Sequence, residues 1–457
     1  MKREDYTARG YQQLIGQHIL AYDRCAVWAG MGMGKTVSTL TALDACMMAG
    51  ESHPTLILAP LRVARSTWPD EARKWNHLRN TTIMPIVGSE KERRAALRYD
   101  AALYTTNYDN LPWLIEHWGE RWPYRTVVID EATKVKSFRL KQGGKRAQSL
   151  ARVAHTKVKR LIELTGKPAP NGLADLWGQM WFVDAGQRLG RTFTAFRERW
   201  FQKSFDGYGI SPLPNAQAEI EARLRDVCIT IDPADWFDLE KPIATPKYVD
   251  LPPKARELYR DMERKMFMEL DGVEIEAFSA AARTIKCLQL ANGAAYIDDR
   301  QNWREVHDEK LQVLEEVVEE ANGAPVLCAY HFKSDVERIK KAFPDAKLLA
   351  DDAEMKAFKT GKYRLGVGHP QSIGHGIDGL QEVCNIVCFF GHWWDADTRA
   401  QFIERVGPVR QLQAGKKRPV FIYDIVARDT IDEEVILRVD NKVSVQELLL
   451  QAMKKRG

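Results

Sequence analysis

The sequence predicts an α/β protein that consists of two tandem parallel-sheet domains with helical insertions. Three observations indicate this class: short apolar runs alternate with helix-like segments, a Pro-rich stretch interrupts them at 232–253, and the alternation then resumes. At 457 residues, the chain is too long for one ordinary hydrophobic core, so we expect two or three domains.

The N-terminal part contains apolar runs with the length and composition of buried strands. They are "CAVWA" (25–29), "TLILA" (55–59), "AALY" (101–104), "TVVI" (126–129) and "RLIEL" (160–164). A helical pattern at 36–49 separates the first two runs, as expected of a parallel sheet covered by helices. We assign residues 1–236 to this domain and interpret 181–230, which are aromatic-rich and helical in pattern, as a helical insertion.

The Pro-rich residues 237–253 are interpreted as a linker, and residues 254–457 as a second domain with a short C-terminal tail. A helical segment at 254–292 opens this domain. Its predicted strands are 325–329, 363–367, 385–390 and 419–426, and its predicted helices include 334–343 and 430–439.

Composition excludes several classes of protein. No apolar run approaches the ~18 residues of a membrane span, and the N-terminus has no signal-peptide pattern. Seven cysteines without a Cys-x-x-Cys pair predict a reduced, cytoplasmic protein with neither a structural zinc site nor a disulfide framework. The net charge of +5 is only mildly basic and does not by itself indicate a nucleic-acid partner.

The segment "WAGMGMGKTVSTL" (28–40) follows the first predicted strand and opens a helix, which is the context of a phosphate-binding loop. Gly30, Gly32 and Gly34 allow a tight turn that points N–H groups at phosphates. Lys35 is placed to reach the β- and γ-phosphates of a nucleotide, and Thr36 to hold Mg²⁺.

Asp130 and Glu131 follow the predicted strand 126–129, where an open parallel sheet binds its ligands. Beside a phosphate loop, Asp130 is expected to orient Mg²⁺ through water, and Glu131 to polarise the water that attacks ATP. ATP and Mg²⁺ are therefore the predicted cofactors.

The order of motifs resembles the superfamily-two helicase-like ATPases, and within them the Swi/Snf-type DNA translocases in a compact, bacteriophage-like form. The similar segments are "ARGYQQLIGQHIL" (8–20), "LILAPLRVARSTWPDEARKW" (56–75), "DEATKVKS" (130–137), "LTGKPAPNGLADLW" (164–177), "SIGHGIDGL" (372–380) and "QFIERVGPVRQ" (401–411). The resemblance implies two RecA-like domains with ATP between them. It also implies nucleotide contacts from Gln12, Asp378 and Gln401, and location in the host cytoplasm if a phage encodes the chain.

The chain departs from the family pattern at three places. Thr133 replaces a His, and Asp378 stands where Asn is usual. Arg405 is in register with the family's arginine motif, but Pro408 occupies the second arginine position and the next arginine is Arg410. We expect a helix that starts near Thr398 to break close to Gly407, which frees Arg410 to act as the arginine finger with support from Arg405.

A basic run follows the two carboxylates. From Ala132 to Arg160 there are ten Lys or Arg residues and no Asp or Glu, which favours a track for nucleic-acid phosphates. The predicted nucleic-acid contacts from this run and the motif after it are Lys134, Lys136, Lys141, Lys145, Arg146, Thr165 and Lys167. Because no base-reading pattern is visible, we expect sequence-independent binding to duplex DNA.

The sequence thus predicts an ATP-dependent motor that moves along double-stranded DNA. Three alternatives stay open: a strand-separating helicase that acts on DNA or RNA, a phage DNA-packaging motor, and a non-catalytic nucleic-acid-binding protein with a degraded ATP site. The biological pathway, the protein partners and the oligomeric state cannot be predicted.

Overall fold

A computed structural model describes residues 3–51, 53–141, 143–169, 172–203, 210–268, 277–296, 302–373 and 378–439. The chain divides into two compact units, with the boundary between Asp238 and Leu239. The expected C-terminal tail lies outside the described residues.

The first unit contains a seven-stranded sheet in the order β3-β4-β2-β5-β6-β1-β9. Every neighbouring pair in it is parallel. The strands are β1 (Arg24–Ala29), β2 (Thr55–Ala59), β3 (Ile83–Pro85), β4 (Leu103–Asn107), β5 (Thr126–Asp130), β6 (Arg160–Thr165) and β9 (Cys228–Ile231). The parallel sheet predicted for this half is confirmed, although β4 begins two residues later than the run that predicted it.

Helices connect these strands. They are α1 (Gly10–Ala21), α2 (Lys35–Met48), α3 (Trp68–Lys74), α4 (Glu90–Ala96), α5 (Leu111–Trp118), α6 (Lys145–Ala154), α7 (Asp175–Asp184), α8 (Phe193–Trp200) and α9 (Ala216–Leu224). The expectation of a purely helical insertion at 181–230 is wrong. This region also contains the antiparallel hairpin of β7 (Phe201–Lys203) and β8 (Ile210–Pro212), and it ends in β9, which extends the main sheet beside β1.

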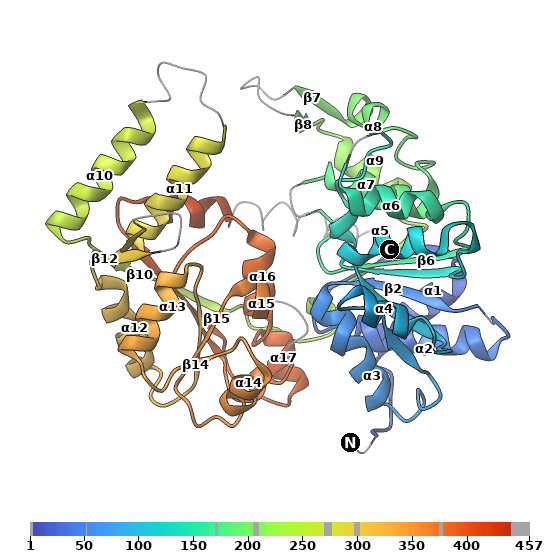
Figure 1. Cartoon of the computed structure of the whole chain (residues 1–457), viewed down its shortest axis with the longest axis horizontal. Coiled ribbons are helices and arrows are strands. Elements are labelled where there is room, and N and C mark those ends of the chain that lie inside the picture. Colours follow the sequence, from blue (N-terminus) through green and yellow to red (C-terminus); the bar gives the residue numbers. More distant parts are fainter. Residues whose placement is uncertain are drawn as a thin grey trace. The chain divides into compact units, whose positions relative to one another are not determined.

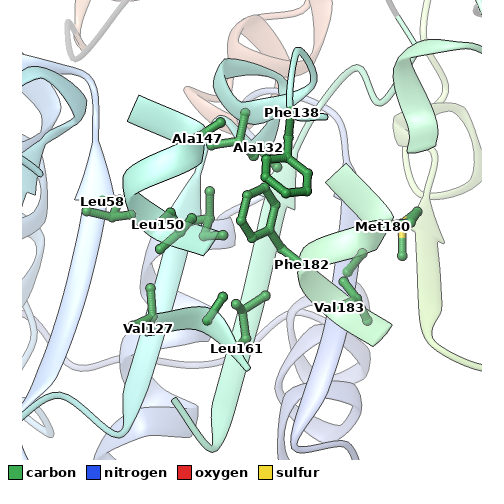
Figure 2. Packing of buried hydrophobic residues seen from close by; sticks show 14 of the residues in the cluster. Leu58, Val127, Ala132, Phe138, Ala147, Leu150, Leu161, Met180, Phe182 and Val183 are labelled. Atoms are coloured by element: carbon green, nitrogen blue, oxygen red, sulfur yellow. The ribbon is translucent and has the colours of Figure 1, made fainter. Parts of the chain in front are cut away.

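The core of the first unit forms where α6 and α7 pack on β5 and β6 (Figure 2). Leu150 and Phe182 come from the helices, and Val127 and Leu161 from the strands, and all four are fully buried. Phe138 adds a ring to this cluster, with its centroid 5.0 Å from that of Phe182. A residue of the basic run is therefore anchored in the hydrophobic core.

The second unit contains a six-stranded parallel sheet in the order β10-β17-β16-β13-β15-β14. Its strands are β10 (Ile243–Val249), β13 (Val326–Ala329), β14 (Lys347–Leu348), β15 (Leu365–Gly368), β16 (Ile386–Phe389) and β17 (Phe421–Ala427). The expectation that 237–253 is only a linker is therefore wrong, because β10 lies within it. Pro246 is tolerated in β10 because this strand lies at the edge of the sheet, where one side needs no N–H donor.

The helices of the second unit are α10 (Pro253–Met268), α11 (Ala277–Ala291), α12 (Glu309–Glu320), α13 (Lys333–Ala342), α14 (Asp352–Phe358), α15 (Pro370–Ile373), α16 (Ala396–Glu404) and α17 (Pro408–Gln413). Residues 431–439 form one more helix. The helices α10 and α11 pack as a pair, as Figure 1 shows. After α11, β11 (Ala294–Tyr296) and β12 (Trp303–Glu305) form a short antiparallel pair.

A buried lysine ties several of these elements together. The Nζ atom of Lys310 in α12 donates to Asp432 Oδ2 at 2.6 Å, to Asn292 Oδ1 at 2.8 Å and to the Phe390 carbonyl at 3.2 Å. The side chains of Lys310 and Asp432 are both fully buried. Asn292 in turn donates to Asp335 Oδ2, which also accepts the N–H groups of the loop after β13.

All seven cysteines are buried and carry free thiols. Among the described helices, none combines the length with the hydrophobicity that crossing a membrane requires.

Replacement of Lys310 by Met tests the role of the buried charge. The variant leaves the Asp432 carboxylate buried without its cation, which should cost about 3–5 kcal/mol of unfolding free energy. Urea denaturation measures the effect. The control is Lys341→Met on the exposed end of α13, which should stay within about 0.5 kcal/mol of the wild type. Equal stability of the two variants would contradict this account.

Candidate nucleotide site and basic surface

The candidate nucleotide site forms at the carboxyl ends of three neighbouring strands. The sheet order places β6 between β1 and β5, and all three are parallel. The phosphate loop follows β1, Asp130 ends β5, and Thr165 ends β6. Since neighbouring strands lie about 4.8 Å apart, the backbones of β1 and β5 are separated by roughly 10 Å.

The phosphate loop has the backbone that its glycines predicted. Gly32 and Gly34 have φ angles of 77° and 69°, a region that only glycine adopts readily. A Cβ atom at Gly34 would lie 2.2 Å from Gln12 Nε2, so the glutamine side chain approaches the loop closely. Gly30 lies against Pro233 in the same way. The loop therefore has the curvature that phosphate binding requires, and other residues pack closely against it.

Lys35 is the first residue of α2, with Thr36 next to it. The Nζ atom of Lys35 donates to the carbonyls of Ala29 at 2.6 Å and Gly30 at 3.1 Å, within the loop itself. The side chain of Gln12 lies beside Gly34, and its Oε1 atom accepts the N–H of Arg9 at 2.9 Å. The structure thus brings Gln12, Lys35 and the glycine loop together.

Asp130 is half-buried at the end of β5, and its Oδ2 atom accepts a hydrogen bond from Trp68 Nε1 at 2.9 Å. Burial and the neighbouring charge of Glu131 raise the pKa of Asp130 to about 6, while Trp68 and Lys35 act in the opposite direction. A carboxylate that is costly to ionise by itself is one that a cation stabilises strongly.

Glu131 has φ 62° and ψ 59°, a left-handed conformation that costs a non-glycine residue about 1 kcal/mol or more. Two contacts fix it: the Tyr108 hydroxyl donates to the carbonyls of Asp130 at 2.5 Å and Glu131 at 3.3 Å, and Lys134 N–H donates to the Glu131 carbonyl at 2.9 Å. Backbone strain of this kind is typical of functional positions.

The residues at this site fit a Mg²⁺ ion and a nucleoside triphosphate. Thr36 and Asp130 offer a hydroxyl and a carboxylate, the oxygen ligands that Mg²⁺ prefers. The glycine loop at the N-terminus of α2 and the ammonium group of Lys35 offer positive charge to phosphates.

The basic run does not form one uniform surface. Arg139 lies over the ring of Phe193, with its guanidinium carbon 3.4 Å from the ring centre. Lys136 pairs with Asp175 at 3.1 Å, and Arg160 is buried against Glu51. The exposed basic residues of the run are Lys134, Lys141, Lys145, Arg146, Arg152 and Lys159.

One of the predicted nucleic-acid contacts is buried, and a second is half-buried. Thr165 is buried, and its hydroxyl accepts the N–H of Lys167 at 3.1 Å, so this residue supports the turn instead of offering a surface to DNA. Lys136 is half-buried and forms an ion pair with Asp175. Residues 170–171 of the same motif lie outside the described residues.

The second unit brings Asp378, Arg405 and Arg410 together. The helix α16 ends at Glu404 and α17 begins at Pro408, so the predicted break near Gly407 is confirmed. Arg410 Nη1 forms an ion pair with Asp378 Oδ1. Gln401 lies in α16 and is half-buried, and 374–377 of the glycine-rich motif lie outside the described residues.

Trp68 holds the Asp130 carboxylate and Tyr108 holds the backbone of Asp130 and Glu131, but the sequence did not assign either aromatic residue to the site. Trp68 belongs to a segment quoted for the family resemblance, but no pattern indicated that its indole N–H faces Asp130. Tyr108 directly follows β4, so its place at the carboxyl edge of the same sheet was a usable signal.

Trp68→Phe removes the hydrogen bond to Asp130 and keeps an aromatic ring in the core. Asp130 is expected to hold Mg²⁺ through water, and loss of a partner that orients such a residue typically costs about 10–100-fold in metal affinity. A Mg²⁺ titration of ATP hydrolysis should therefore shift to higher metal concentration. Trp113→Phe, on α5, is the control, and a shift of the same size in both variants would sink the assignment.

Comparison with known proteins places the chain in a family. The SNF2-related domain matches residues 25–305. Over 458 residues the chain is 53% identical to "Putative protein p41" of Acyrthosiphon pisum secondary endosymbiont phage 1, covering 99% of both proteins. It is 24% identical to "Uncharacterized ATP-dependent helicase MG018" of Mycoplasma genitalium, covering 89% of this chain and 38% of the helicase.

The chain spans 12% of "Helicase SWR1" of Yarrowia lipolytica, to which it is 31% identical over 219 residues. A solved structure, the Sulfolobus solfataricus SWI2/SNF2 ATPase core in complex with dsDNA, aligns with 98% of this chain and 94% of its own at 20% identity and a TM-score of 0.46. On the domain match and the phage relative, this chain belongs to the SNF2-related family.

Proposed function

We propose that the chain is a Mg²⁺-dependent ATPase that converts hydrolysis into movement along double-stranded DNA. The observation that carries the proposal is the arrangement at the sheet edge of the first unit. There the glycine loop with Lys35 and the strained, anchored Glu131 follow strands that are separated by β6 alone. Family membership supports the same chemistry.

Hydrolysis needs charge stabilisation and an oriented water molecule. Lys35 places a positive charge at the β- and γ-phosphates, while Glu131 orients the water and withdraws its proton. Thr36 and Asp130 would hold Mg²⁺, which screens the phosphate charges when it is bound. Gln12 offers both a donor and an acceptor to the adenine, beside the loop.

We assign Arg410 as the arginine that stabilises charge on the transferred phosphoryl group, with Arg405 in support. Gln401 and Asp378 are the other residues of the second unit that we assign to nucleotide binding. Because a guanidinium presents several donors in one plane, it matches phosphate oxygens better than an ammonium group does.

DNA contact is assigned to the exposed part of the basic run, Lys134, Lys141, Lys145 and Arg146, together with Lys167. Arg146 also pairs with Asp109, with its Nε atom 2.7 Å from the carboxylate. Exposed lysines and arginines bind the phosphate backbone without reading sequence, which suits a motor that must pass over any DNA.

Lys35→Ala should abolish hydrolysis, because it removes the charge at the β- and γ-phosphates. Glu131→Gln should still bind ATP but turn over at least about 100-fold more slowly, since an amide cannot accept the proton of the water. Nucleotide binding and phosphate release are measured in parallel on each variant. Wild-type turnover by Glu131→Gln would show that the water-activating residue is misassigned.

The double variant Lys141→Glu, Lys145→Glu tests the basic surface without breaking the Arg146–Asp109 pair. Affinity for duplex DNA should fall, and the slope of log affinity against log salt should shrink by about one to two units. Hydrolysis stimulated by DNA should fall with it. Lys91→Glu on α4 is the control, and an unchanged salt slope in the double variant would leave these lysines as ordinary solvated residues. Parallel assays with single-stranded DNA and RNA test the alternative substrates.

A further inference from the structure

We propose that Asp378 is a positioning residue for Arg410, and that its carboxylate holds the guanidinium in the orientation needed for catalysis. The inference rests on the proposed function, in which Arg410 acts on the phosphates of ATP. Two of the three positions at which the chain departs from its family pattern, the acid at 378 and the displaced arginine at 410, would then act together.

The backbone around Arg410 is held in place by the break between two helices. Gly407 has φ −63° and ψ 166° and caps α17, and Pro408 occupies the first turn of that helix. Since Pro has no N–H and a fixed φ angle, it starts a helix more readily than it continues one. Because the break starts α17 at Pro408, Arg410 is the third residue of this helix and has a defined position in its first turn.

A buried glutamine locks the break. Gln411 is 1% exposed, and its Nε2 atom donates to the carbonyls of Cys384 at 2.8 Å and Val406 at 2.9 Å. Its Oε1 atom accepts from Arg418 Nε at 2.9 Å. Because both polar atoms of the Gln411 side chain are hydrogen-bonded, the Cα position of the neighbouring Arg410 is fixed. Only the side chain of Arg410 needs a further restraint.

Asp378 supplies that restraint. Its Oδ1 atom pairs with Arg410 Nη1 and also accepts from Gln381 Nε2 at 3.2 Å. Gln381 is itself fixed, because its Oε1 atom accepts the N–H of Gly379 at 3.0 Å. Gln381 therefore orients the Asp378 carboxylate, and this carboxylate orients the Arg410 guanidinium.

The exposure of the two partners suits a positioning role. The side chain of Arg410 is 13% exposed and that of Asp378 is 74% exposed. A largely covered guanidinium with one charged partner adopts few rotamers, so less conformational freedom is lost when it meets a phosphate. Asn at 378 would keep the shape but lose the charge that makes this hydrogen bond strong.

Steady-state ATP hydrolysis in the presence of duplex DNA tests the proposal on the full chain. The variants are Asp378→Asn, Asp378→Glu, Arg410→Ala and the double variant Asp378→Asn, Arg410→Ala. The control is Asp345→Asn, an exposed aspartate of the same unit. Because Asp378 lies at the surface, its variants are expected to fold, and circular dichroism checks this.

Asp378→Asn should lower kcat about tenfold with little change in KM, since the arginine acts in the transition state. Asp378→Glu should turn over faster than Asp378→Asn. In the Arg410→Ala background, Asp378→Asn should have no further effect, because residues that act as a unit are not additive.

Two outcomes would overturn the inference while leaving the ATPase in place. An equal loss of kcat from Asp378→Asn in both backgrounds would mean that Asp378 acts independently of Arg410. Faster hydrolysis by Asp378→Asn would mean that the pair restrains the arginine instead of presenting it. By contrast, if the wild-type protein releases phosphate no faster than the Lys35→Ala variant, the proposed function itself is wrong.

Discussion

The parallel order of three neighbouring strands is the constraint on which the candidate site depends. In a parallel sheet every strand ends at the same edge, so the segments that follow β1, β6 and β5 meet there although more than a hundred residues separate the first from the last. The phosphate loop, the turn at Thr165 and the pair Asp130–Glu131 occupy these three ends. The chemistry of the site follows from this adjacency more than from any single side chain.

Buried polar groups at both sheets are held by specific partners. The half-buried Asp130 carboxylate accepts from Trp68 and its backbone carbonyl accepts from Tyr108, while the fully buried Lys310 donates to Asp432 and Asn292. A buried charge without a partner is expensive, so these contacts restrict each unit to one arrangement of loops. The same physical requirement therefore supports the geometry of the candidate site in the first unit and loop geometry in the second.

The basic run shows why a charge pattern alone does not define a binding surface. Phe138 enters the core, Arg139 packs on Phe193, and Lys136 and Arg160 meet acids that lie far away in the sequence. Only part of the run stays exposed, and it is this part to which we assign DNA contact. The number of charges counted in the sequence was correct, but the residues that pair with them lie elsewhere in the chain.

The sequence by itself determined the class of fold, most strand positions, the glycine loop, the carboxylate pair and the helix break at Pro408, because each depends on local residue chemistry. It missed β10, since a Pro-rich edge strand lacks the local signature of a strand, and it missed β9 within the predicted insertion. Only the tertiary structure decided that Trp68 faces Asp130, that Thr165 is buried and that Arg410 pairs with Asp378. These contacts join residues 32 to 62 positions apart or depend on packing around a strand end, and such distances are set by the folded core, not by neighbours in the chain.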